Sequence, residues 1–300
     1  MAPHEPDGGS PEVPPSVRTA LPDRETLARF YVFGWERRWL ARLDDRGIPG
    51  DAGYKLRLRN TLALLRPPPG PFRLLDVGCG VGIYAAQIAR RFPRARILGI
   101  DLSPAHVEAA RSLAARLGVS DRVGFQVGDA LALEVTEPPH VILAAEVIEH
   151  LVDPLPCLVR LAHLVAPGGQ VLLSVPQKLP HEPEGPWIYH RRPTGGNYDS
   201  LEDTDRARLG EGSEVYTYYH RHYRSEELDD LLRGAGLVIR RRRVCFWQRP
   251  PHRADAVSRW LDYCNQRSAI PALDQVLIRL DGPEYAHNLI RDCAPAGAVP

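Results

Sequence analysis

The sequence has few lysines, one methionine and no long apolar run. Lysine occurs only at Lys55 and Lys178 among 38 basic residues, so arginine carries almost all of the positive charge. This bias, with much alanine and proline, is typical of a GC-rich genome, and we give single arginines little functional weight. Because 37 acidic residues leave a formal net charge of +1, binding to nucleic acid or to an anionic membrane is not favoured.

Cysteine is also scarce, and the five residues are Cys79, Cys157, Cys245, Cys264 and Cys293. An odd number without a CxxC pair indicates neither a zinc site nor a disulfide framework, and it is typical of a reducing compartment. The N-terminus lacks a basic start followed by an apolar core. No segment approaches the roughly 18 apolar residues that a membrane span needs. We therefore expect a cytoplasmic protein that does not enter a membrane.

The length and the apolar content of 44% suit one large α/β domain with additions rather than two domains. Proline, glycine and serine dominate residues 1–23, which we expect to form a disordered tail. Residues 24–70 are predicted to form an N-terminal helical cap, because apolar and aromatic residues recur at helical spacing between Leu27 and Leu43. This cap either packs on the core or covers the substrate. Residues 71–300 are predicted to form the main domain.

Short apolar runs alternate with amphipathic helices after residue 70, which is typical of a Rossmann-like, doubly wound and mostly parallel sheet. The seven predicted strands are Arg73–Val77, Arg96–Ile100, Val123–Val127, Val141–Ala145, Gln170–Val175, Leu237–Cys245 and His287–Cys293. The predicted helices between them are Ile83–Arg91, Ala105–Leu117, Leu155–Leu164 and Ser225–Gly234. Two segments are additional to this alternation of strands and helices. They are a long polar substrate loop at 177–223 and a C-terminal helical insertion at 251–280. We expect both at the carboxyl edge of the sheet, where ligands bind in open α/β folds.

A glycine-rich turn follows the first predicted strand, with the sequence Asp76-Val77-Gly78-Cys79-Gly80-Val81-Gly82. Glycines at this spacing allow a tight turn and let a ligand lie against the backbone at the start of a helix. The dinucleotide fingerprint GxGxxG would need a glycine where the chain has Ile83. Asp76 would repel a pyrophosphate but suits the ammonium group of a methionine moiety. The turn therefore favours an amino-acid nucleoside over a dinucleotide.

Two more carboxylates follow the next two predicted strands. Asp101 can accept hydrogen bonds from both hydroxyls of a ribose, and Leu102 can pack on an adenine. Asp129, after the third strand, can accept a hydrogen bond from the adenine amino group. Each aspartate taken alone is equally typical of a helix cap or a turn. Three acids at three successive strand ends together indicate a nucleoside site.

These motifs resemble those of the class I S-adenosylmethionine-dependent methyltransferases. The glycine turn, Gly-Ile-Asp-Leu-Ser at 99–103, Gly-Asp-Ala at 128–130, Ala-Glu-Val-Ile-Glu-His at 145–150 and Pro-Gly-Gly at 167–169 occur in that family's order and spacing. The resemblance covers about residues 72–176 and implies a methyltransferase whose cofactor is S-adenosylmethionine. It implies that the cofactor is lined by Asp76, Gly78, Gly80, Asp101, Leu102, Asp129 and Ala130, with Glu146 on the cofactor side.

Glu146, Glu149 and His150 are spaced so that a helical turn would place them on one face. Two carboxylates and an imidazole can hold a divalent cation such as Mg or Mn. The run resembles the Glu-Val-x-Glu-His segment of ubiquinone-biosynthesis O-methyltransferases and of small-RNA 3′-terminal 2′-O-methyltransferases, where the resemblance implies metal ligands. In the alternative interpretation Glu146 only contacts the cofactor side, Glu149 caps and His150 packs. Magnesium is therefore a candidate and not a prediction.

A second histidine-rich segment, residues 218–224, precedes the predicted helix Ser225–Gly234 and resembles the Arg-His-Tyr segment of many small-molecule methyltransferases. His220 or His222 can reach the site as a base or a distal metal ligand, because histidine titrates near neutral pH. Solvent-facing loop residues give an equally good interpretation. The candidate catalytic residues are His150 and His222. The longer histidine-rich signature of the RNA enzymes is not present.

Four consecutive arginines, Arg240 to Arg243, lie in a predicted strand and would point alternately to its two faces. We interpret them as a solvated sheet edge rather than a nucleic-acid site. The sequence as a whole predicts a monomer or homodimer that transfers a methyl group to an oxygen of a small molecule. The alternatives are transfer to nitrogen or carbon, metal-dependent 2′-O-methylation of RNA, and a non-enzymatic protein that binds a nucleoside or NAD.

Overall fold

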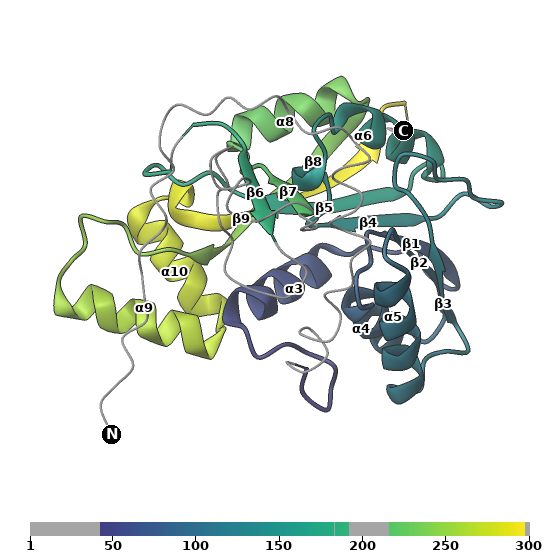
Figure 1. Cartoon of the computed structure of the whole chain (residues 1–300), viewed down its shortest axis with the longest axis horizontal. Helices are drawn as coiled ribbons and strands as arrows, with labels where there is room; N and C mark the ends of the chain where they lie inside the picture. Colours follow the sequence, from purple (N-terminus) through teal and green to yellow (C-terminus); the bar gives the residue numbers. More distant parts are fainter. Residues whose placement is uncertain (1–42, 183, 192–215, 298–300) are drawn as a thin grey trace, which may run out of the picture.

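The computed structural model describes residues 43–182, 184–191 and 216–297. A seven-stranded sheet forms its centre, in the order β3-β2-β1-β4-β5-β9-β8 (Figure 1). The strands are β1 Phe72–Val77, β2 Ala95–Asp101, β3 Val123–Val127, β4 Val141–Ala145, β5 Gln170–Pro176, β8 Leu237–Trp247 and β9 Ala286–Pro295. Strands β1 to β5 are parallel, whereas β9 is antiparallel to both β5 and β8. The predicted Rossmann-like, mostly parallel sheet is confirmed.

Helices cover both faces of the sheet, which explains why its central strands are apolar throughout. The helices are α3 Ala52–Leu64, α4 Ile83–Arg91, α5 Pro104–Arg116, α6 Leu155–Leu164 and α8 Ser225–Gly234, with single 3-10 turns at Ile148–His150 and Pro283–Tyr285. Leu74 packs in the cluster formed with α3, α4 and α5, whereas the next residue, Leu75, packs with α6 and α8. Every residue of β5 is buried. The chain therefore has one core on each face of one sheet.

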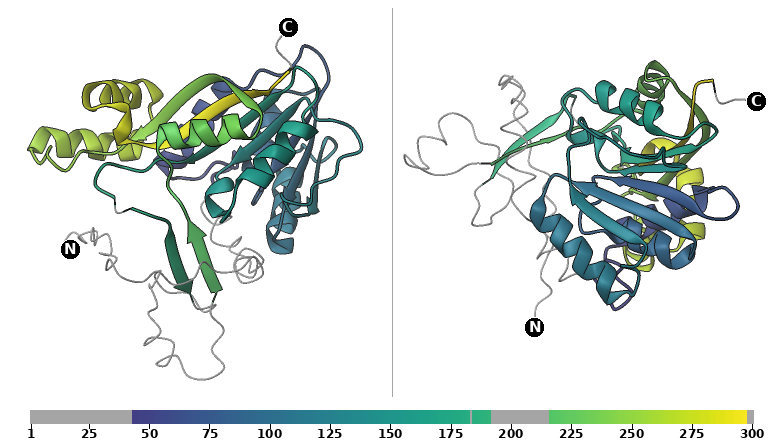
Figure 2. Two further views of the ribbon diagram at one scale, coloured as in Figure 1. Left: turned by 90° about the horizontal axis from the view of Figure 1, so that it is seen from above. Right: turned by 90° about the vertical axis from the view of Figure 1, so that its right-hand side faces the viewer.

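Two additions leave the sheet at the edge where the parallel strands end. Helices α9 Ala256–Ser268 and α10 Pro271–Asp281 join the end of β8 to the start of β9. Strands β6 Trp187–Arg191 and β7 Tyr216–His220 form a separate antiparallel ribbon that projects from the sheet (Figure 2). Both additions therefore lie at the carboxyl edge, as predicted. None of the helices in the described ranges is long and apolar enough to cross a membrane.

The segment 177–223 differs from the polar loop predicted for it, because it contains β6 and β7. The two strands pair in register, with Tyr189 opposite Tyr218. Aromatic residues favour paired strands, and the richness of this segment in proline and glycine concealed that preference. The intervening residues 192–215 lie outside the described part of the chain.

Residues 1–42, which include the predicted tail and much of the predicted cap, also lie outside the described residues. The chain is not helical between Leu43 and Asp51, where a continuous helix was predicted. Leu43 instead forms a bridge with Pro49 across a turn. Glycine and proline break the helix here, and Asp51 begins α3 by accepting a hydrogen bond from the Tyr54 N–H at 2.6 Å.

The arginine run lies on β8, the edge strand of the sheet, where Arg240 and Arg242 are exposed and the other two are half-buried. The Arg241 Nε donates to Asp292 Oδ2 at 2.6 Å, and the Arg242 Nε donates to Asp229 Oδ2 at 2.6 Å. Asp229 also accepts a hydrogen bond from Arg291 Nε at 2.6 Å, and the Arg291 side chain is 1% exposed. The predicted solvated edge is therefore present, and two of its arginines also pair with buried carboxylates.

We predict that Asp229→Ala lowers the free energy of unfolding by about 3–5 kcal/mol, because it leaves the Arg291 guanidinium buried without its counterion. Asp230→Ala is the matched control: the side chain is 75% exposed and pairs with Arg233 on the surface of α8. Its expected cost is below about 1 kcal/mol. Urea unfolding followed by circular dichroism measures both values, and equal costs would contradict the prediction.

Candidate active site

The glycine turn after β1 has the backbone that the sequence predicted. Gly78 and Gly80 have φ values of 63° and 52°, in the left-handed region that side chains disfavour. A Cβ atom on Gly78 would lie 2.6 Å from Val147 Cγ2, whereas one on Gly80 would have no atom within 4 Å. Gly78 therefore packs tightly against Val147, just after β4, whereas there is free space beside Gly80.

Asp101 fastens this turn to the end of β2. Its Oδ2 accepts a hydrogen bond from the Gly80 N–H at 2.8 Å, and its Oδ1 accepts one from the Ser103 N–H at 2.9 Å. His106 Nδ1 lies 3.2 Å from the same Oδ1. Carboxylate oxygens have about two lone-pair sites each, so these contacts leave acceptor capacity for a ribose. Asp101 thus has a structural role, and ribose binding stays a prediction.

Asp76 is a buried carboxylate with an unused oxygen. The side chain lies at 2% residue exposure inside β1, and its Oδ2 has no hydrogen-bond partner among the described residues. Burial and, to a lesser extent, the nearby charge of Asp101 raise the pKa of Asp76, and a hydrogen bond from the Ala85 N–H lowers it. The net result is a pKa of about 8. A buried acceptor without a donor fits a ligand that brings a positive charge to this position.

Asp129 follows β3 and shapes the turn there. Its Oδ1 accepts a hydrogen bond from the Leu131 N–H at 2.8 Å. The Gly128 N–H donates to the Asp101 carbonyl at 3.0 Å, which joins the ends of β2 and β3. Leu102 and Ala130 are half-buried at the same edge. The structure therefore brings the predicted nucleoside residues together, and their contact with adenine stays a prediction.

Glu146 lies directly after β4 with φ 58°, a left-handed conformation that is rare for a residue with a side chain. Its carboxylate accepts a hydrogen bond from Ser174 Oγ at 2.9 Å and forms an ion pair with Arg57 Nη1 at 2.9 Å. Asn288 Nδ2 lies 3.4 Å from the same carboxylate. Arg57 comes from α3 and Asn288 from β9, so Glu146 links both ends of the described chain to the centre of the site.

The helical turn after β4 does not place Glu146, Glu149 and His150 on one face. The 3-10 turn begins at Ile148, and Glu146 lies before it with its carboxylate held by Arg57. Within the ranges that the structure describes, no three His, Cys, Asp or Glu residues are arranged to hold a metal ion. In this part of the chain the three candidate ligands therefore do not meet at one point, and the Glu146 carboxylate is paired with the Arg57 guanidinium.

Glu149 and His150 are buried between the sheet and the ribbon. Neither oxygen of the Glu149 carboxyl has a hydrogen-bond partner among the described residues, and burial raises its pKa well above the usual range. His150 Nδ1 lies 3.1 Å from the Tyr219 carbonyl, to which it donates. Burial lowers the pKa of His150 to about 4. Burial thus disfavours the charged form of both side chains, whose Nε2 and Oε1 atoms lie 3.7 Å apart.

Four imidazole rings lie in a row beside these residues. The ring centroids of His150 and His220 are 5.1 Å apart, those of His220 and His222 are 5.0 Å apart, and those of His222 and His287 are 5.7 Å apart. Burial lowers the pKa of His220 to about 2 and also lowers that of His287. His222 Nδ1 lies 2.7 Å from an oxygen of Glu182. Sequence reasoning missed His287 and Glu182, which no local motif identifies.

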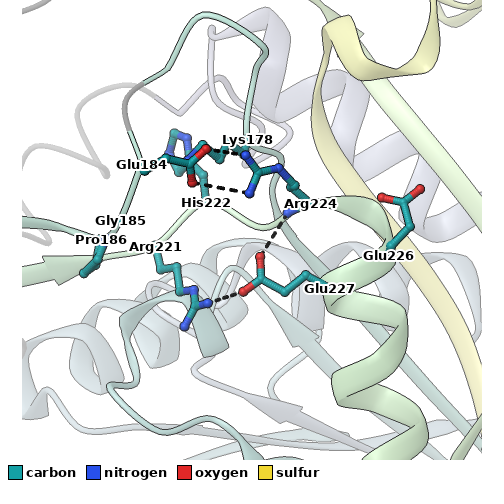
Figure 3. A pocket seen from close by; sticks show the side chains of 9 residues that line it. All are labelled: Lys178, Glu184, Gly185, Pro186, Arg221, His222, Arg224, Glu226 and Glu227. Atoms are coloured by element: carbon teal, nitrogen blue, oxygen red, sulfur yellow. Dashed lines mark hydrogen bonds and ion pairs between the residues drawn. The ribbon is translucent and has the colours of Figure 1, made fainter.

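A pocket of polar character opens at the base of the ribbon, beside the row of imidazoles (Figure 3). Its lining residues are Lys178, Glu184, Gly185, Pro186, Arg221, His222, Arg224, Glu226 and Glu227. Lys178 and Arg224 both pair with Glu184, and Arg221 pairs with Glu227. Basic and acidic groups are thus balanced around this pocket, and His222 belongs both to its wall and to the row of rings.

Comparison with known proteins identifies the domain to which these elements belong. The family model of the methyltransferase domain matches residues 50–242. The chain belongs to the methyltransferase domain family. This confirms the resemblance that the glycine turn and the strand-end acids indicated.

The matched relatives act on different small molecules. The chain is 40% identical over 113 residues to trans-aconitate 2-methyltransferase of Methylobacterium radiotolerans, which covers 38% of this chain and 41% of that protein. It is 34% identical over 109 residues to ubiquinone biosynthesis O-methyltransferase of Xylella fastidiosa, which covers 36% of this chain and 44% of that protein. The chain thus spans less than half the length of these curated relatives.

The structure also resembles that of the CcbJ methyltransferase from Streptomyces caelestis. The TM-score is 0.55 at 17% identity, and the match covers 89% of this chain and 98% of that chain. At this level of identity the similarity shows a shared fold. The methyltransferase family and the fold are therefore established together, while the acceptor of this chain is not fixed by them.

We predict that apo protein loses stability through Asp76 as the pH rises from about 4 to about 8. In this window the folded state keeps a proton, since burial raises the pKa of Asp76 to about 8, whereas the unfolded chain has released it above the ordinary aspartate pKa of 3.8. Asp76→Asn removes this dependence. The difference between the free energies of unfolding of Asp76→Asn and of wild type should therefore shift in favour of the variant by up to about 1.4 kcal/mol for each pH unit in this window.

Chemical denaturation of apo protein at half-unit pH steps measures this difference. Asp121→Asn is the control, because that side chain is 71% exposed and its profile should follow wild type. Parallel profiles for wild type and Asp76→Asn would contradict the prediction.

Proposed function

We propose that the chain transfers a methyl group from S-adenosylmethionine to an oxygen of a small molecule. The observation that carries this proposal is the acidic lining of the glycine turn, where Asp76 has an unpartnered buried oxygen next to the Asp101 carboxylate that holds Gly80. Such a site favours a cationic nucleoside over the diphosphate of a dinucleotide, because an ammonium group can donate to the unpartnered Asp76 oxygen, whereas a diphosphate would bring negative charge next to Asp101. Membership of the methyltransferase domain family supports the same cofactor.

In this proposal different residues bind different parts of the cofactor. Asp76 binds the ammonium group of the methionine moiety, and Asp101 binds the ribose hydroxyls with its remaining lone pairs. Asp129, Leu102 and Ala130 surround the adenine. The cofactor supplies a methyl group activated by a sulfonium, whose leaving group is a neutral thioether and needs no acid. The main work of the protein is alignment of the acceptor in a site protected from water.

The row of imidazoles favours oxygen as the acceptor atom, because an imidazole can serve as the base that a hydroxyl acceptor requires. A neutral hydroxyl must lose its proton as it reacts, so it requires a base, and histidine is the usual one near neutral pH. His150 is a weak base because burial lowers its pKa to about 4, and its Nδ1 donates to a carbonyl. We therefore assign the base to His222 and regard His150 as a fixed wall of the acceptor site. The balanced charges of the pocket suit a polar small molecule.

Replacing Asp101 should weaken the cofactor site more than it weakens the fold. We predict that Asp101→Ala raises the Kd for S-adenosylhomocysteine at least about tenfold, because the Gly80 N–H loses its partner and the ribose loses an acceptor. Isothermal titration measures the change, and Asp121→Ala serves as the exposed control. Unchanged affinity in Asp101→Ala would contradict the proposed ribose contact.

An acceptor panel decides which atom is methylated. Purified protein is incubated with S-adenosylmethionine and with phenols, alcohols, carboxylic acids, amines and RNA oligonucleotides, and S-adenosylhomocysteine release is measured. We expect turnover with oxygen acceptors of low molecular mass, and no loss of it with a chelator. Methylation confined to amines, to carbon or to RNA would contradict the oxygen assignment. Binding of NAD without binding of S-adenosylhomocysteine would contradict the cofactor assignment itself.

A further inference from the structure

The two ends of the projecting ribbon are bonded to each other where it leaves the sheet. The Tyr223 N–H donates to the Pro176 carbonyl at 3.0 Å, and the Lys178 N–H donates to the Tyr223 carbonyl at 3.0 Å. The Glu182 N–H donates to the Leu179 carbonyl at 3.1 Å, which folds the outgoing segment into a turn. These bonds bring Glu182 to the side of His222, although the two are 40 positions apart in the chain.

Glu182 and His222 form a close and largely buried pair. The distance from His222 Nδ1 to Glu182 Oε2 is 2.7 Å, and the side chains are 8% and 11% exposed. A carboxylate can only accept a hydrogen bond, so Nδ1 must carry the hydrogen. The lone pair of the neutral ring is then on Nε2, at the opposite edge of the imidazole. The contact therefore fixes both the tautomer and the orientation of the ring.

We propose that Glu182 is a positioning residue that prepares His222 to remove the proton of an acceptor hydroxyl. This inference rests on the proposed methyltransferase function and extends it to the acceptor side of the site. The hydroxyl oxygen forms its bond to the methyl carbon while the bond from that carbon to sulfur breaks, and the electron pair stays on sulfur. The hydroxyl proton moves to His222 Nε2 and afterwards to solvent. Glu182 stabilises the imidazolium that forms.

The rest of the row explains why this proton goes to His222. His220 and His287 face the ring of His222, and burial holds both of them uncharged near neutral pH. Around the pocket, Lys178, Arg221 and Arg224 are balanced by Glu184, Glu226 and Glu227. Glu182 therefore supplies the negative charge in direct contact with the ring. The acceptor class that this arrangement fits is a small alcohol or phenol that enters through the pocket.

Nuclear magnetic resonance of the imidazole nitrogens tests the pair without any acceptor. We expect the wild-type His222 signal, assigned by its loss in His222→Asn, to show the Nδ1–H tautomer. Glu182→Gln should reduce the share of this tautomer, because a side-chain amide can donate to Nδ1 as well as accept from it. Glu184→Gln removes a neighbouring but exposed carboxylate and should change the share much less. An Nε2–H tautomer in wild type, or equal changes in the two variants, would overturn the proposal.

Turnover of the acceptor found in the panel provides the second measurement. Glu182→Gln should lower kcat about tenfold or more with KM within about threefold. His222→Asn should lower kcat about 100-fold or more, and Glu182→Gln should add little to it, since both act through one ring. Glu108→Gln, on the exposed side of α5, should match wild type. Wild-type turnover by Glu182→Gln would overturn the positioning role.

Binding of S-adenosylhomocysteine distinguishes failure of this inference from failure of the proposed function. Each variant should bind it with a Kd within about threefold of wild type, because neither Glu182 nor His222 lies at the glycine turn. If wild type does not bind S-adenosylhomocysteine, the proposed function fails. If it binds and turns over while Glu182→Gln behaves like wild type, only the pairing of Glu182 with His222 fails.

Discussion

The hydrogen bond from the Gly80 N–H to the Asp101 carboxylate is the contact on which the cofactor side of this molecule depends. Parallel strands all end at one edge, so the loops after β1, β2 and β3 must share a small space there. The left-handed glycines let the first loop fold back, and Asp101 joins it to the second. The Gly128 N–H then joins the third loop to the backbone of Asp101. One side chain and its own carbonyl thereby order three loops.

Glu146 has the corresponding role at the end of β4. Its backbone is held in an unfavourable left-handed conformation by the Ser174 carbonyl, and its carboxylate collects donors from α3, β5 and β9. A residue with a strained backbone persists only where its surroundings determine it strongly. Glu146 is therefore a junction between elements that are distant in sequence, and it is located next to the turn whose Gly78 touches Val147.

The sequence was sufficient for the sheet and for the grouping of the strand-end acids because both depend on local signals. Apolar runs marked the strands, and the acids that follow them, such as Asp101 and Asp129, needed only a strand count to be brought together. The residues around the imidazole rings depend on contacts across long separations. Arg57 reaches Glu146, and Glu182 reaches His222, through turns that no residue pattern specified. The candidate metal ligands were chosen by their spacing alone, and spacing did not reveal that Glu146 pairs with the Arg57 guanidinium of another helix.

The ribbon of β6 and β7 begins just after Glu182 and ends just before His222. Its hydrogen bonds to the sheet are made at its base, through Pro176, Lys178 and Tyr223. Changes in the ribbon away from the buried Tyr219, whose carbonyl contacts His150, can therefore be tolerated while the base keeps its geometry. Under the proposed function, substrate preference can then diverge among related proteins without disturbing the strand ends proposed to bind the nucleoside. The part of the chain that is least regular in sequence would then be the part most open to evolutionary variation.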